Sequence, residues 1–156
     1  MKLYHGSTID ITKIDLALSK PNKDFGRAFY LSDDYQQALE MAQFRAEFED
    51  AEPVVNVYEF DETLFRNFSF KRFEAYTEEW AHFVYDHRTE PQGQTLHNYD
   101  IVYGPIANDR VGAQIARYKQ GYITFDEFLS RIQYIKGITF QYAFCTQQAI
   151  DKLIKI

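Results

Sequence analysis

The irregular order of strand-like and helix-like segments constrains the fold of this chain more than any other feature of its sequence. The clearest strand is Val54–Phe60, which is rich in β-branched and aromatic residues. Shorter strand patterns cover residues 1–4, 28–31, 99–103 and 138–145. Helical patterns cover residues 34–48, 73–87, 109–118, 124–137 and 147–154. Because strands and helices do not alternate one by one, the sequence predicts an α+β fold rather than a doubly wound parallel sheet.

Turn and cap residues mark the ends of several of these elements. Thr124 and Glu127 form a capping box, which starts a helix that Gly137 ends. Gly104-Pro105 follows the strand at 99–103 and predicts a turn. Thr146 is placed to cap the last helix. The chain of 156 residues has no internal repeat, and we expect one domain, 1–156.

Composition narrows the class of protein. Aromatic residues make up 17% of the chain, so we expect a core packed around rings and not a disordered chain. The formal net charge of −6 argues against broad binding to a nucleic-acid backbone. The start of the chain has no signal-type apolar core, and no run approaches the roughly 20 apolar residues that span a bilayer. We therefore expect a cytoplasmic protein without a membrane partner.

Cysteine and histidine are too sparse to suggest a disulfide framework or a metal site. Cys145 is the only cysteine, which excludes a disulfide within the chain and fits a reducing compartment. His82 and His87 are five residues apart, so they do not share a helix face. The sequence thus predicts no zinc site and no metal cofactor.

Two stretches combine apolar residues with polar or aromatic groups suited to a site. The first runs Leu3-Tyr4-His5-Gly6-Ser7, and the second runs Asp24-Phe25-Gly26-Arg27-Ala28-Phe29-Tyr30-Leu31-Ser32. A histidine and a tyrosine at strand ends, beside a glycine that lets backbone approach a ligand, can form two walls of a polar cleft. Each residue also has a simpler reading: His5 as a hydrogen-bonded strand end, Tyr30 as core packing and Gly26 as a turn.

A third stretch, Phe140-Gln141-Tyr142-Ala143-Phe144, completes a pattern with these two. Together they resemble the ADP-ribosyltransferase fold, in the branch that includes diphtheria toxin and the poly(ADP-ribose) polymerases. The stretches Asp24–Tyr30 and Tyr99–Ala107 also resemble an uncharacterised bacterial group, often encoded beside a small partner protein in a toxin–antitoxin arrangement. The resemblance implies two small packed antiparallel sheets that form a cleft, flanked by helices.

The resemblance also implies a site that binds NAD as a substrate. His5 would hydrogen-bond a ribose hydroxyl, the Gly6 backbone would pair with the nicotinamide carboxamide, and Tyr30 would lie against the nicotinamide ring. Tyr35 or Phe44, on the following helix, would supply a second ring wall. The full set of expected NAD-binding residues is His5, Gly6, Ser7, Asp24, Gly26, Tyr30, Tyr35 and Phe44. The expected catalytic residues are His5, Tyr30 and Gln141.

Gln141 departs from the family pattern, because it stands where those enzymes carry a catalytic glutamate. An amide stabilises a ribose cation far less than a carboxylate, and losing one preorganised group can cost about 10²–10³ in rate. Three outcomes remain open: slow transfer, transfer aided by another acid such as Asp24 or Asp109, or binding alone.

These outcomes define the functions that we expect. The first is transfer of ADP-ribose from NAD to a protein or nucleic-acid acceptor by a toxin-like effector with a small neutralising partner. The alternative is a non-catalytic module that binds NAD or ADP-ribose. An RNA 2′-phosphotransferase shares the fold, but the acidic balance and the lack of clustered arginines argue against it.

Overall fold

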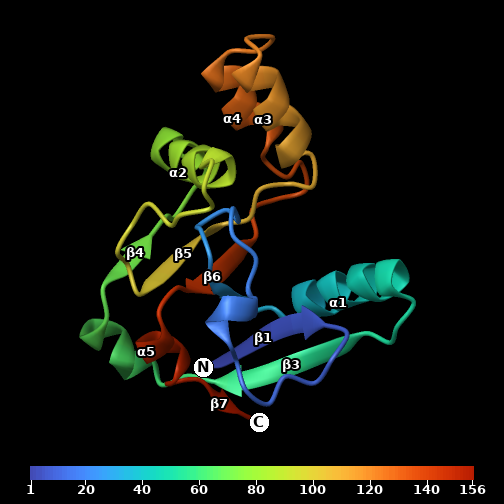
Figure 1. Cartoon of the computed structure of the whole chain (residues 1–156), viewed down its shortest axis with the longest axis vertical. Helices are drawn as coiled ribbons and strands as arrows, with labels where there is room; N and C mark the ends of the chain where they lie inside the picture. Colours follow the sequence, from blue (N-terminus) through green and yellow to red (C-terminus); the bar gives the residue numbers. More distant parts are fainter.

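Two small sheets organise the chain in the computed structural model, which describes all 156 residues (Figure 1). The first has the order β1-β3-β7 and comprises Lys2–Ser7, Val54–Glu59 and Ile154–Lys155. The second has the order β2-β6-β5-β4 and comprises Phe29–Leu31, Phe140–Phe144, Ile101–Pro105 and Phe70–Arg72. The predicted α+β class is confirmed.

The first sheet is antiparallel, as expected, but the second is mixed. Strands β2, β6 and β5 pair antiparallel, whereas β4 and β5 run parallel. The parallel pair arises because the chain crosses from β4 to β5 through α2 (Glu78–Thr89), and parallel neighbours need such a long connection. A bridge between Tyr4 and Ser32 joins the two sheets: each backbone N–H donates to the other's carbonyl, at 2.7 and 2.8 Å.

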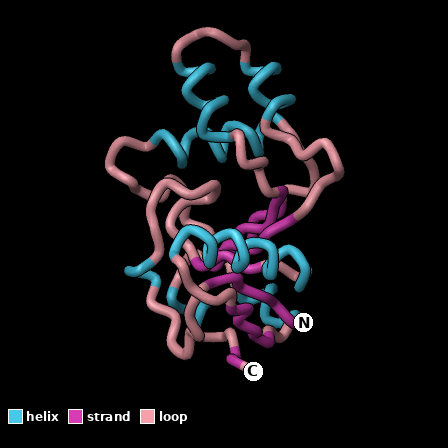
Figure 2. The backbone as a smooth tube through the Cα atoms, turned by 90° about the vertical axis from the view of Figure 1, so that its right-hand side faces the viewer, coloured by secondary structure: helices cyan, strands magenta, loops and turns pink.

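The remaining helices are α1, α3, α4 and α5, at Tyr35–Glu49, Val111–Lys119, Phe125–Arg131 and Gln147–Ile150. Short 3-10 turns lie at Leu16–Leu18 and Glu62–Asn67. Helix α1 packs along β1, while α3 and α4 stand beyond α2 at the far end of the molecule (Figures 1 and 2). The capping box at Thr124 and the Thr146 cap are both confirmed. No helix combines the length and apolarity needed to cross a membrane.

The second sheet is a middle layer with a core on each face. In β6, Tyr142 and Phe144 belong to the core shared with the first sheet, where Leu3 and Tyr58 also lie. Ala143 points the other way, into the core that contains Trp80 of α2. Because both faces are buried, β5 and β6 read as nearly continuous apolar runs rather than as alternating strands.

Gly104 and Pro105 were expected to form a turn, but they continue β5 and pair with Gln141 and Phe140. The glycine is needed for packing. A Cβ at position 104 would lie 2.9 Å from the Phe25 ring, so a larger residue would not fit there. The turn prediction was therefore wrong.

Three helix boundaries also differ from the sequence prediction. Helix α2 begins at Glu78 and not near residue 73, because the Phe73 N–H donates to the Tyr103 carbonyl and so stays with the sheet. Helix α4 ends at Arg131, well before Gly137. Helix α5 ends at Ile150, and the expected helical residue Ile154 instead pairs with Glu59 of β3.

Candidate functional site

The carboxylate of Asp24 is the centre of a polar cluster that joins three distant parts of the chain. Its Oδ1 accepts a hydrogen bond from Arg88 Nε at 2.7 Å, and its Oδ2 accepts one from Gln141 Nε2 at 3.1 Å. Asp24 is only 6% exposed. A carboxylate is costly to bury unless it is paired and hydrogen-bonded, and here both oxygens are satisfied.

Each member of the cluster is placed by a different element. Asp24 lies in the loop before β2, Arg88 in the last turn of α2 and Gln141 on β6. Arg88 uses only Nε for Asp24, and its terminal Nη groups make no hydrogen bond to the protein. Since the Arg88 side chain is 30% exposed, these two Nη groups remain free to bind an anion.

Tyr30 lies on the same face of the second sheet as Gln141. It pairs directly with Ala143, two residues along β6 from Gln141, and alternate residues of a strand share a face. The Tyr30 hydroxyl donates to the Gly26 carbonyl at 2.8 Å and accepts from the Phe25 N–H at 2.9 Å. Burial, and then the nearby charge of Asp24, raises the pKa of Tyr30, so the phenol stays protonated.

His5 contacts the opposite side of β2. Its ring stacks on Phe29 at 4.3 Å, while its Nδ1 lies 2.7 Å from the Tyr30 carbonyl. A carbonyl oxygen only accepts, so Nδ1 carries the proton. Burial lowers the pKa of His5 to about 4, which makes the imidazole neutral at pH 7. Its Nε2 is then an acceptor that no protein group occupies.

Positive charges gather beside the cluster in this acidic protein. Partial burial of the Lys23 ammonium lowers its pKa, and the charges of Arg88, Arg45 and Lys20 lower it further. The charge of Arg45 also acts on His5. The charges of Lys20, Arg45 and Arg88 therefore repel that of Lys23, and an anion bound among them would relieve this repulsion.

Four other predicted NAD-binding residues lie on β1 and α1 rather than in the Asp24 cluster. Gly6 lies against α1, where an added Cβ would be 2.2 Å from the Ala38 carbonyl oxygen, so the space beside it is filled by the helix. Ser7 is buried at the end of β1. Tyr35 packs edge-on to Tyr4, and Phe44 lies on the exposed side of α1 against Phe48.

Comparison with known protein families assigns this chain to a family. Residues 1–155 match a family described as "Protein of unknown function (DUF3990)". The chain belongs to this family. No curated protein and no solved structure matched it. The DUF3990 match covers every residue of the Asp24 cluster, including Arg88 and Gln141.

Two histidines that the sequence prediction did not place at the site, the buried His87 and the half-buried His97, hold a loop beside it. His97 Nε2 lies 2.8 Å from the Phe25 carbonyl, and its Nδ1 accepts from the Tyr99 N–H. In the same way, His87 Nδ1 lies 2.8 Å from the Phe83 carbonyl, and its Nε2 accepts from the Leu96 N–H. Each ring donates at one nitrogen and accepts at the other, so both must be neutral. Burial lowers the pKa of both.

Arg88 was also missed, because a basic residue in the last turn of a helix is explained by the helix dipole alone. Its partner Asp24 is 64 residues away, and no local spacing connects the two. The structure contains no group of three or more His, Cys, Asp or Glu side chains placed to hold a metal ion.

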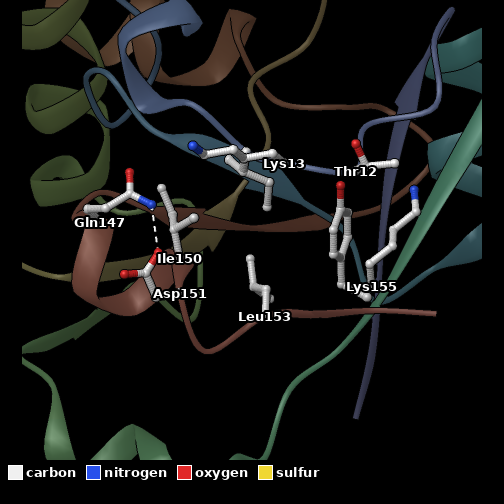
Figure 3. A pocket seen from close by; sticks show the side chains of 9 residues that line it. Thr12, Lys13, Gln147, Ile150, Asp151, Leu153 and Lys155 are labelled. Atoms are coloured by element: carbon white, nitrogen blue, oxygen red, sulfur yellow. Dashed lines mark hydrogen bonds between the residues drawn. The ribbon is translucent and has the colours of Figure 1, made fainter.

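A separate cavity of about 230 Å³ lies between β3, β7, α5 and the loop at residues 12–14, away from the predicted site residues (Figure 3). Most of its polar groups are already paired within the protein. Lys155 binds Asp10, Gln147 donates to Asp151 at 2.7 Å, and the Tyr58 hydroxyl donates to Ile11. The Asp24 cluster, with free donors on Arg88, is therefore the better candidate site, and the free acceptor on His5 lies on the other side of β2.

Proposed function

We propose that this DUF3990 protein binds NAD beside the Asp24 cluster and transfers its ADP-ribose to a protein or nucleic-acid acceptor. The observation that carries the proposal is the hydrogen bond from Gln141 to Asp24. Gln141 occupies the position at which the ADP-ribosyltransferase resemblance expects a carboxylate. Asp24 supplies a carboxylate within 3.1 Å of that position.

Asp24 is the better of the two acids considered for this role. Asp109 is exposed and makes no hydrogen bond or ion pair with Gln141, Arg88 or Tyr30. Breaking the nicotinamide–ribose bond creates an oxocarbenium-like ribose, which a nearby negative charge stabilises. Asp24 would act on this cation, with Gln141 holding the carboxylate in place.

The surrounding groups suit the rest of NAD. The free Nε2 of neutral His5 can accept a hydrogen bond from a ribose hydroxyl. The Nη groups of Arg88 and the ammonium of Lys23 can bind the diphosphate. Tyr30 offers an aromatic surface whose position is fixed by two hydrogen bonds. Because His5 lies on the other side of β2 from Tyr30, NAD would have to cross the β2 edge of the second sheet to contact both.

The proposal extends to a toxin-like effector neutralised by a small partner protein. This part rests on the resemblance to the bacterial toxin–antitoxin group alone. A second candidate function, a non-catalytic module that binds NAD or ADP-ribose, is favoured by the ion pair of Asp24 with Arg88. The arginine offsets part of the negative charge that catalysis needs.

Labelled NAD distinguishes the two functions. The protein is incubated with a cell lysate and NAD labelled in its adenylate part, and both released nicotinamide and label on macromolecules are measured. Transfer predicts both signals, and Asp24→Asn should lower them by about 10²-fold. Asp109→Asn is the matched control and should retain full labelling. Circular dichroism melting of each variant verifies that it is folded.

The remaining outcomes of this experiment are also decisive. NAD binding by calorimetry without nicotinamide release would favour the binding module. Equal labelling by wild type and Asp24→Asn would exclude the role assigned to Asp24. No detectable NAD binding would overturn both candidate functions.

A further inference from the structure

Helix α1 carries a row of large apolar side chains on its outward face. Met41, Phe44 and Phe48 are 53%, 61% and 81% exposed. Their spacing of three and four residues places them on one side of the helix. Figure 2 shows α1 crossing the front of the molecule, with the strands behind it. We call these three residues the α1 stripe.

The stripe is not needed to attach α1 to the protein. The attachment uses the opposite face, where the small residues Ala38, Ala42 and Ala46 are buried. Ala38 and Ala42 lie against Gly6 of β1, which lets the helix approach the strand closely. Phe44 and Phe48 contact each other, with ring centroids 5.4 Å apart, and expose the rest of their surface to solvent. Contiguous exposed apolar surface of this kind marks interaction sites.

Acidic residues border the stripe on one side. Glu40 and Glu47 lie seven residues apart on the adjoining helix face, and Asp50 follows at the end of the helix. None of the three forms an ion pair within the protein. Beside this end of α1 is an open groove of about 490 Å³, lined by Gln43, Ala46, Glu47, Asp50, Ala51 and Pro53.

We propose that the α1 stripe is the docking site for an amphipathic helix of a partner protein, one whose apolar face is bordered by lysines or arginines. An apolar row that covers about two helical turns can pack against the apolar row of a second helix. The unpaired carboxylates of Glu40, Glu47 and Asp50 select a basic border on that helix. This inference is independent of NAD binding.

Charge also distinguishes a basic partner helix from two alternative occupants of the stripe, a second copy of this chain and an anionic membrane surface. In a symmetric dimer with antiparallel α1 helices, the two stripes would meet and the acidic borders of both copies would face each other. Like charges facing each other across an interface disfavour that arrangement. An anionic membrane surface would be repelled by the same carboxylates.

The test uses a synthetic peptide as the partner. The probe is a helical peptide of about 18 residues made of Leu, Lys and Ala, with Leu on one face and Lys along its edges. One control peptide has the same composition in scrambled order, and a second has Glu in place of Lys. Binding to the full chain is followed by fluorescence anisotropy. We expect binding of the Lys-edged peptide, weakened at higher salt, and at least about tenfold weaker binding of both controls.

Variants then locate the binding surface. Phe44→Ser/Phe48→Ser should weaken binding of the Lys-edged peptide by about tenfold or more, as should Glu40→Lys/Glu47→Lys. Leu18→Ser removes an apolar side chain that is 82% exposed elsewhere, so it is the matched control and should bind like wild type. Because all of these residues are exposed, melting temperatures should stay unchanged.

Three results would overturn the proposal. The first is equal binding of the probe and the scrambled peptide. The second is unaltered probe binding by the Phe44→Ser/Phe48→Ser variant. The third is a dimer of the wild type in sedimentation that the same variant converts to a monomer, which would make a second copy the occupant.

Discussion

The Nε2 atom of Gln141 lies 3.1 Å from Oδ2 of Asp24, so an amide and a carboxylate share one hydrogen bond at the centre of the candidate site. The pair joins β6 to the loop before β2, and Arg88 fixes the second carboxylate oxygen from α2. This hydrogen bond is the basis of the first prediction, because a glutamate at position 141 would face the Asp24 carboxylate.

Gln141→Glu should destabilise the protein even though it introduces the residue that the family resemblance expects. Two carboxylates about 3 Å apart repel, which raises the pKa of the pair in the folded state. The folded variant therefore binds more protons, and its loss of stability is relieved as the pH falls. We expect a cost of about 1–3 kcal/mol at pH 7 in urea unfolding, decreasing towards pH 5.

The double variant Asp24→Asn/Gln141→Glu exchanges the amide and the carboxylate and restores a complementary pair. It should recover most of the stability that Gln141→Glu loses. Under the proposed function it also moves the carboxylate to the position used by the resembling enzymes, so nicotinamide release should persist. A double variant no more stable than Gln141→Glu would show that this hydrogen bond is not what positions the two residues.

Lys23→Ala should weaken NAD binding, because it removes one of the cations proposed to hold the diphosphate. The expected rise in Kd is about threefold to tenfold, and the salt dependence of binding should become shallower. Isothermal titration at two salt concentrations measures both quantities. Lys119→Ala, an exposed lysine at the end of α3, is the matched control. The same Kd for both variants would remove Lys23 from the site.

Gly6→Ala should destabilise the fold through steric overlap between β1 and α1. The new Cβ would lie 2.2 Å from the Ala38 carbonyl oxygen and 2.7 Å from the Ala42 nitrogen, and neither backbone atom can move freely. We expect a cost of about 3 kcal/mol, or a fall in Tm of about 10 °C. Gly112→Ala on α3 meets nothing within 4 Å and should be neutral or slightly stabilising. Equal melting of the two variants would contradict the observed contact.

Acid should destabilise the protein through three neutral histidines, the buried His87 and the half-buried His5 and His97. His5 has a folded pKa of about 4, against an ordinary value of 6.5, so the unfolded chain binds more protons between these values. Its stabilising effect is present above pH 6.5 and is lost as the pH falls towards 4. The size of the effect is about 3 kcal/mol. His87 and His97, whose pKa values are also lowered, add to it in the same direction.

Urea unfolding between pH 7.5 and pH 4 measures this loss, and His5→Asn isolates the part due to His5. The amide can still donate to the Tyr30 carbonyl but does not titrate, so the variant should lose less stability on acidification than the wild type. An identical pH dependence for both proteins would mean that His5 does not titrate in this range.

The strongest local patterns predicted the fold well, and the weaker ones failed where distant residues decide the structure. The strand at Val54–Phe60 and the helix beginning at Asp34 were predicted because β-branched runs and caps act within a few residues. Gly104 was assigned to a turn because its contact with Phe25 comes from another part of the chain. The end of the last helix was misplaced because β3 captures Ile154 as a strand residue.

For the candidate site too, the sequence predicted individual residues but not their contacts with distant parts of the chain. Asp24 and Gln141 were selected from the sequence as separate residues, but their hydrogen bond spans 117 positions. Arg88 gave no signal, since a cation near a helix end has a sufficient local explanation. Gly6 was selected for its lack of a side chain, and the structure uses that feature for contact with α1. Residue type was therefore informative, whereas the partner of each residue came only from the folded chain.

The hydroxyl of Tyr30 fixes the backbone of the turn at Phe25 and Gly26, because it accepts one hydrogen bond from this turn and donates another to it. Gly26 has a φ of +88°, a conformation that suits a residue without Cβ. A molecule arriving at this turn would meet backbone that is already fixed. Little chain entropy would then be lost on association, and the turn should have the same shape in the free and the occupied protein.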